Sequence, residues 1–266
     1  MTAEPSDAQK KYLQSIQKRK YWILAAQVFL LLGFLTVWEF SVEKGYLNGF
    51  IFSSPCRVVQ CFYTMLKDQS LFLHLGITLL ETFASFALIL GLTLGVSILL
   101  WWCKPLADIL EPYLVVLNSL PKSALAPILI VWLGNNMKTI IITAISIAVF
   151  GSILNLYQGF RKVDPDRLIL IRTLGGSKRD CLFLAVIPSC IPLFVSLMKV
   201  NIGLSLVGVI IGEFLAARAG LGYLIIYGSQ VFKMDWVMMS IILLCLIAVL
   251  LYQLLHLVES YAAKNM

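Results

Sequence analysis

DPDRLILIRTLGGSKRDCLFLAVIPSCIP, residues 164–192, is a polar and basic stretch inside a chain that is otherwise mostly apolar. Within it, Gly175 is followed after nine residues by Ala-Val-Ile-Pro at 185–188. An ordinary basic loop, which is the alternative interpretation, does not need a fixed spacing between a glycine and a proline. The stretch therefore predicts a short ordered segment that joins two apolar helices.

The rest of the chain has the composition of an integral membrane protein. Of its 266 residues, 60% are hydrophobic and only 13% are charged, and the mean hydropathy is +0.89. A soluble domain of this length cannot cover so much apolar surface with so few charges. Several apolar runs reach the roughly 20 residues that cross a bilayer core as a helix. We therefore expect an all-α polytopic protein embedded in a lipid bilayer.

The apolar runs predict six transmembrane helices, within a membrane domain that covers residues 21–258. Residues 1–20 and 259–266 are the polar segments that flank it. Residues 39–76 combine a Ser-Ser-Pro turn with an amphipathic stretch, which predicts a short helix lying at the membrane surface. The expected spans are 21–38, 77–102, 109–133, 139–158, 188–213 and 236–258.

The distribution of positive charge predicts the orientation of these helices. With a cytoplasmic N-terminus, the inner segments hold 13 Lys and Arg residues and the outer segments hold 6. Cytoplasmic loops carry an excess of Lys and Arg, so both termini and the 164–192 stretch are expected in the cytoplasm. The net charge of +7 is thus explained by topology, and no nucleic-acid partner is expected.

Four stretches, in order, resemble the permease subunits of ABC importers of the nitrate, sulfonate and taurine type, a group that also serves thiamine-precursor pyrimidines. The 164–192 stretch resembles the coupling motif E-A-A-x3-G-x9-I-x-L-P of that family, although Ile169, Leu170 and Ile171 stand where the motif has E-A-A. The resemblance implies a type I ABC importer permease fold in the bacterial cytoplasmic (inner) membrane. The other three stretches are SSPCRVV (53–59), LNSLPKSALAPILIVWLG (117–134) and LMKVNIGLSLVGVIIGEFLAARAGLGYLI (197–225).

The resemblance implies that residues 164–188 dock on an ATPase. Apolar side chains would enter a cleft on that partner, and charged side chains at the rim would fix the orientation. Two glycines would end the helix and allow a sharp turn. The predicted apolar residues are Leu168, Ile169, Ile171 and Leu174, the charged ones are Asp166, Arg167 and Arg172, and the glycines are Gly175 and Gly176.

Polar residues inside predicted spans are costly, so they are expected to line a path or to pair with one another. A translocation path would include Asn118, Lys122, Lys199, Asn201 and Glu213. Two lysines there suit an anionic solute. The alternative, which we favour, is that Lys199 snorkels or pairs with Glu81 or Glu213 for structural reasons only.

Small residues and prolines mark further features of the spans. Gly91 with Gly95, and Gly208 with Gly212, have the GxxxG spacing that allows close helix packing. Three prolines at 112, 121 and 127 interrupt the third predicted span. Backbone groups freed by proline at membrane depth are tolerated beside protein or a water-filled cavity, so this span is either a gating helix or a static kink.

The motifs of an enzyme are missing from the sequence. It has no G-x4-G-K-[ST] phosphate-binding loop, no H-E-x-x-H and no G-x-S-x-G, and its two histidines, His74 and His256, are far apart. We therefore expect no catalytic residue, no metal site and no cofactor in this chain, with ATP and Mg bound by the partner ATPase.

Together these features predict a transporter subunit that works with several partners. The expected partners are an ABC ATPase dimer, a second permease chain that is identical or related, and an extracytoplasmic solute-binding protein. The solute would be small and polar or anionic, resembling a sulfonate, taurine, nitrate or a pyrimidine. The alternative is an ion-coupled secondary transporter, which predicts an inverted repeat; we find none in the sequence.

Overall fold

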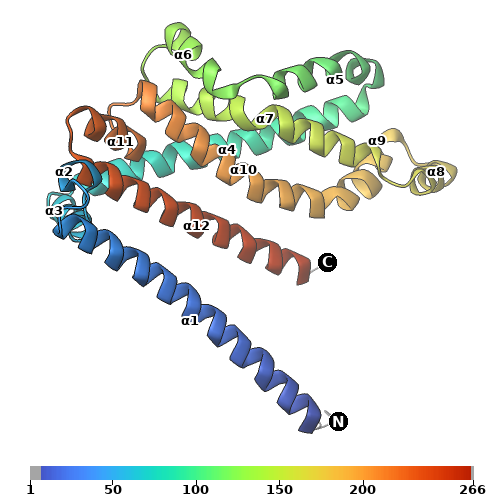
Figure 1. Cartoon of the computed structure of the whole chain (residues 1–266). Helices are drawn as coiled ribbons and strands as arrows, with labels where there is room; N and C mark the ends of the chain where they lie inside the picture. The colour runs from blue at the N-terminus through green and yellow to red at the C-terminus, as the bar shows by residue number, and fades with distance from the viewer. Residues whose placement is uncertain (1–6, 265–266) are drawn as a thin grey trace.

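The computed structural model describes residues 7–264, and these are helical throughout apart from short turns, with no strand among them. Five helices are long and apolar enough to cross a membrane (Figure 1). A sixth span is obtained if two bent neighbours, α5 (Lys104–Ser119) and α6 (Lys122–Leu133), are counted together. The five are α1 (Asp7–Glu43), α4 (Ser70–Trp102), α7 (Met137–Arg161), α10 (Ile187–Ala216) and α12 (Met234–Lys264).

The third predicted span, 109–133, is not one continuous helix. Helices α5 and α6 meet at 104°, and the break lies at Leu120 and Pro121. Proline disfavours the helical conformation of the residue before it, and Leu120 is indeed extended, with ψ at 145°. Pro112 and Pro127 lie inside α5 and α6 without ending them, so only one of the three prolines breaks the span.

Helix α7 packs against both α4 and α10 at the centre of the molecule (Figure 1). The backbones of α7 and α10 approach closely because small residues line their contact. A Cβ added to Gly208 would lie 2.5 Å from Ala144 Cα, and one added to Gly212 would lie 3.0 Å from Ile140 Cα. Close approach of this kind stabilises helix pairs in membranes, where burial of apolar surface contributes little driving force for helix association.

The short helices lie at opposite ends of this bundle, as both figures show. Helices α2 (Gly49–Phe52), α3 (Pro55–Lys67) and α11 (Leu221–Gln230) gather at one end, which we call the α3 end. Helix α8 (Pro165–Thr173) projects from the other, the α8 end, toward which α1 and α12 also direct their terminal turns.

Helix α3 is amphipathic and fits the surface helix expected between the first two spans. Ser54 caps its N-terminus, and its buried residues Val58 and Met65 pack in the same apolar cluster as α11 and α12.

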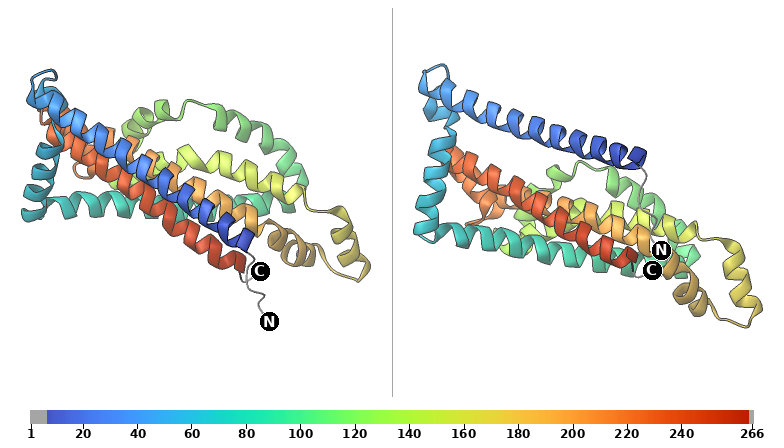
Figure 2. Two further views of the ribbon diagram at one scale, coloured as in Figure 1. Left: turned by 60° about the horizontal axis from the view of Figure 1, so that its bottom comes forward. Right: turned by 90° about the horizontal axis from the view of Figure 1, so that it is seen from below.

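Helix α1 diverges from the other helices along most of its length (Figure 1; Figure 2, right). None of the residues in its most apolar stretch is buried within the chain. It is joined to the rest through α2 and α3 at the α3 end, so its apolar surface is open to lipid or to another protein.

Candidate functional site

The predicted coupling residues form a compact helix-turn unit at the α8 end. Asp164 begins α8, because its Oδ1 accepts a hydrogen bond of 3.0 Å from the Asp166 backbone N–H. Pro165 follows in the first turn, where its missing N–H leaves no donor unpaired.

The two glycines end α8 in a defined turn. The Gly175 N–H donates to the Arg172 carbonyl at 3.0 Å, and the Gly176 N–H donates to the Ile171 carbonyl at 2.9 Å, which is the Schellman arrangement. Gly175 has a φ of +84°, and a Cβ on Gly176 would lie 2.8 Å from the Ile171 carbonyl oxygen. Neither position therefore accepts a larger residue without strain.

A capping box starts the next helix, since Ser177 and Asp180 bond reciprocally to each other's backbone. Helix α9 (Lys178–Asp180) then passes through a π-helical turn, η1 (Cys181–Val186), into α10. The whole unit is thus continuous with a long membrane helix.

The exposed apolar surface of α8 differs from the one predicted. Ile169 and Leu174 are exposed as expected, by 59% and 79%. Leu168 instead packs against the bundle, and Ile171 is partly buried beside Gly176. Leu170, absent from the predicted set, is 61% exposed. It lies four residues before Leu174 and so shares its helix face, a periodicity that was visible in the sequence.

Two basic side chains tie this unit to the membrane helices. Arg167, predicted as a free rim charge, donates from Nη1 to Ser189 Oγ of α10 at 3.2 Å. Lys178, which sequence reasoning missed, donates from Nζ to the Trp102 carbonyl at 2.5 Å. The same ammonium lies 5.8 Å from the Trp101 ring centre and 5.7 Å from that of Trp102. Asp166 and Arg172 remain exposed.

Two of the predicted path residues meet at the break between α5 and α6. Lys122 Nζ donates to Asn118 Oδ1 at 3.3 Å. The Asn118 amide lies against α7, because a Cβ on Gly151 would be only 2.9 Å from its Oδ1. The structure thus brings Asn118 and Lys122 together at this break.

Lys199 lies elsewhere, and its predicted partners were wrong. It pairs with Glu259 of α12, and not with Glu81 or Glu213; His256 lies 3.4 Å from the same carboxylate. The hydrogen bond from Lys199 holds the pKa of Glu259 below its ordinary value. The charge of Lys199 is therefore already compensated within the chain. The partner is 60 residues away in sequence, so no local signal could have identified it.

Asn201 is fully buried between α10 and α7. Its Oδ1 accepts a 2.5 Å hydrogen bond from Ser152 Oγ. This contact joins two helices and faces no cavity that we find among the described residues.

Glu213 organises the α3 end of the bundle. It is 1% exposed, and its carboxylate accepts from Thr78 Oγ1 of α4 and from the Gly222 N–H, each at 2.6 Å. Thr78 in turn accepts from the Leu221 N–H at 2.8 Å. A Cβ on Gly220 would lie 2.3 Å from Glu213 Oε1. Glu213 thus holds α4, α10 and the Gly-Leu-Gly turn together. Of the five predicted path residues, only Asn118 and Lys122 contact each other, and Lys199, Asn201 and Glu213 lie in three other places.

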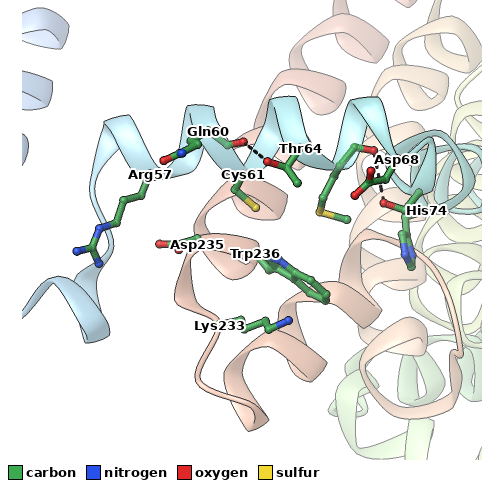
Figure 3. Close-up of a pocket in the computed structure, with 11 residues that line it drawn as sticks. Arg57, Gln60, Cys61, Thr64, Asp68, His74, Lys233, Asp235 and Trp236 are labelled. Atoms are coloured by element: carbon green, nitrogen blue, oxygen red, sulfur yellow. Dashed lines mark hydrogen bonds between the residues drawn. The ribbon is translucent and has the colours of Figure 1, made fainter.

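A large cavity of about 740 Å³ lies at the same end, under α3 (Figure 3). The Trp236 indole points into it, with Lys233 Nζ 4.3 Å from the ring centre. Asp235 accepts a 2.5 Å hydrogen bond from Ser53 Oγ. Burial raises the pKa of the Cys61 thiol to about 11, so this thiol stays protonated and is a poor nucleophile or metal ligand. Among the described residues, no group of acidic, Cys and His side chains fits a metal ion.

Known proteins resemble this chain over most of its length. A probable ABC transporter permease protein of Haemophilus influenzae is 29% identical over 82% of this chain and 88% of its own. The formylaminopyrimidine transport permease protein ThiX of Halalkalibacterium halodurans is 29% identical over 77% of this chain and 81% of its own. The putative aliphatic sulfonates transport permease protein SsuC of Bacillus subtilis is 24% identical over 86% and 83%.

A solved structure supports the fold. The crystal structure of an amino acid ABC transporter with histidines matches with a TM-score of 0.58 and 18% identity, over 77% of this chain and 98% of that one. The family model for the binding-protein-dependent transport system inner membrane component matches residues 82–263. This chain therefore belongs to that family, as a multi-pass ABC permease of the cytoplasmic membrane with a type I fold and no enzymatic activity of its own.

Proposed function

We propose that this permease forms one half of the path of an ABC importer and is driven by an ATPase that docks on α8. The observation that carries the proposal is the exposed apolar surface of Ile169, Leu170 and Leu174, presented on a helix whose end is fixed by the Gly175–Gly176 turn. Apolar side chains exposed on a rigid helix are well suited to enter a pocket on a partner, where they would lose contact with water.

The ties between α8 and the membrane helices supply a route for force. Movement of the ATPase would displace α8, and the bonds of Arg167 to α10 and Lys178 to α4 would transmit that displacement. Relative movement of packed helices would then open the path alternately to each side. In this scheme ATP and Mg bind to the ATPase, and this chain holds no cofactor.

Two further partners follow from the arrangement of the helices. The open apolar surface of α1 favours a second permease chain, identical or related, which would cover it. With the α8 end in the cytoplasm and both termini on that side, the α3 end would face outward and receive a solute-binding protein. The relatives named for sulfonates, taurine and formylaminopyrimidine support a small polar solute without identifying it.

Docking on α8 is tested by co-expressing this permease with its partner ATPase and purifying the two together. In Leu174→Asp, a charge replaces a side chain that is 79% exposed at the α8 end. The control is Tyr46→Asp, since Tyr46 is 80% exposed near the α3 end. We expect Leu174→Asp to lose the ATPase on purification and Tyr46→Asp to retain it.

Equal retention in both variants would refute docking on α8. Uptake driven by an ion gradient, without any ATPase, would instead support the secondary-transporter alternative.

A further inference from the structure

A second, smaller cavity lies at the α3 end, between α4, the α6–α7 loop and the end of α10. Its volume is about 280 Å³, just below the roughly 300–1,000 Å³ of pockets for drug-sized ligands. It therefore suits a molecule of a few heavy atoms. Four polar side chains line it, namely Glu81, Asn135, Asn136 and Arg218.

Glu81 is the deepest of these groups and lacks a hydrogen-bond donor. It is 2% exposed, and its Oε2 has no hydrogen-bond partner among the described residues. An unpaired buried acceptor is costly, most of all at membrane depth. The neighbouring Glu213 carboxyl group hydrogen-bonds to Glu81 and also accepts from Thr78 and from the Gly222 backbone, yet it leaves Glu81 Oε2 without a donor. Glu81 thus has room for a donor that the described chain does not provide.

The pair of carboxyl groups also has the wrong charge balance for an anion site. Two neighbouring buried carboxyl groups can share one proton, and the pair then still carries one net negative charge. No Lys or Arg of the described chain lies within 4.0 Å of either carboxylate. A cationic group with several N–H donors would compensate the charge of this pair and donate a hydrogen bond to Glu81 Oε2.

Arg218 gives the same cavity an opposite charge. Its side chain is exposed and has no ion pair or hydrogen bond among the described residues. Asn135, also exposed and without a side-chain partner there, adds amide donors. One cavity thus presents a buried carboxyl group and a separate free guanidinium.

We propose that this cavity binds a small zwitterion, with its ammonium group on Glu81 and its anionic group on Arg218 and Asn135. The proposal rests on the proposed importer function and replaces the expectation of a purely anionic solute held by two lysines. Those lysines are otherwise engaged, Lys199 with Glu259 and Lys122 with Asn118.

Three probes that share a two-carbon frame separate the possible ligand classes. They are 2-aminoethanesulfonate (taurine), ethanesulfonate, which lacks the ammonium, and ethylammonium, which lacks the sulfonate. Binding is measured calorimetrically on the purified permease–ATPase complex in lipid nanodiscs, without a binding protein. We expect saturable binding of taurine, at least about tenfold tighter than either half-probe, as a hydrogen bond to a charged group warrants.

Charge-removing variants assign the two charges. Glu81→Gln and Arg218→Gln should each weaken taurine binding about tenfold or more, while Glu43→Gln and Lys44→Gln, exposed near the same end of the molecule, should not. Co-purification of the ATPase and its basal hydrolysis monitor folding and test the importer function separately.

Several results would overturn the zwitterion site. Equally tight binding of ethanesulfonate and taurine, with Glu81→Gln unaffected, would indicate an anion site. Equally tight binding of ethylammonium and taurine, with Arg218→Gln unaffected, would indicate a cation site. Absence of taurine binding to an intact, ATP-hydrolysing complex would leave the importer function standing and refute the site.

Discussion

Removing the ammonium group of Lys178 should uncouple the ATPase from the permease without separating them. In Lys178→Met, the Trp102 carbonyl at the end of α4 loses its 2.5 Å hydrogen bond, and two indole rings lose their cation. A hydrogen bond to a charged group contributes about 1.5–3 kcal/mol, and an exposed cation–π contact about 0.5–1 kcal/mol. Because Lys178 is exposed, solvent screening reduces both contributions. We therefore take about 1.4 kcal/mol as the free energy lost in Lys178→Met, which corresponds to a tenfold change in an equilibrium constant.

The assay is ATP hydrolysis by the complex in nanodiscs, with and without its loaded binding protein. We expect basal hydrolysis and ATPase co-purification to be unchanged, because the exposed apolar residues of α8 are intact. The ratio of stimulated to basal hydrolysis should fall about tenfold. Lys162→Met is the matched control, since Lys162 is exposed on the same side and its side chain has no hydrogen bond or ion pair with any residue that the structure describes.

An unchanged ratio in Lys178→Met would refute transmission through α4. An equal fall in both variants would show that positive charge near α8 matters, and not the bond to Trp102.

Two further predictions concern stability. Gly208→Ala should lower the Tm of the complex, because its Cβ would lie 2.5 Å from an α7 backbone atom and overpacking costs about 1–3 kcal/mol; Gly203→Ala, with nothing within 4 Å, should not. In the Lys199–Glu259 pair, the pKa of Glu259 in the folded protein lies below its ordinary value of 4.5. The ion pair therefore stabilises the folded state fully above pH 4.5, and this stabilisation is lost as the pH falls through the folded-state pKa. Thermal unfolding between neutral and acidic pH should therefore show a smaller acid-induced fall in Lys199→Met; identical pH profiles would contradict this.

The sequence predicted those features whose physical cause is local. The length of the apolar runs predicted the long helices, because a helix that crosses a bilayer needs about 20 apolar residues whatever its neighbours are. The Gly175–Gly176 turn followed from glycine's access to positive φ. The position of the break in the third span did not follow, because three prolines offer three possible sites and tertiary context selects Pro121.

Features that depend on distant neighbours were out of reach. GxxxG spacing occurs twice within the predicted spans, yet Gly208 meets the backbone of α7 whereas Gly91 and Gly95 meet nothing within 4 Å. Spacing alone does not say which helix face has a partner.

The hydrogen bond from Lys178 to Trp102 joins residues 76 apart in the sequence. From the sequence alone, the basic residue and the two tryptophans are equally well explained as independent anchors at the membrane interface.

The same two helices connect the ATPase-docking surface with the proposed solute cavity. At the α8 end, α4 and α10 receive Lys178 and Arg167. At the α3 end, they carry Glu81 and Glu213, and the 2.6 Å bond from Thr78 to Glu213 joins them. Helix α4 has 33 residues and is therefore about 50 Å long, so a displacement at one end of such a rigid element is felt at the other.

A solute that alters the position of α4 against α10 would then alter the position of α8, and the reverse must hold by thermodynamic linkage. We infer that Glu81→Gln, although far from the ATPase, changes the solute dependence of hydrolysis and not its basal rate. If basal hydrolysis changed and solute dependence did not, Glu81 would act through the fold of the α3 end, and the two sites would not be linked through these helices.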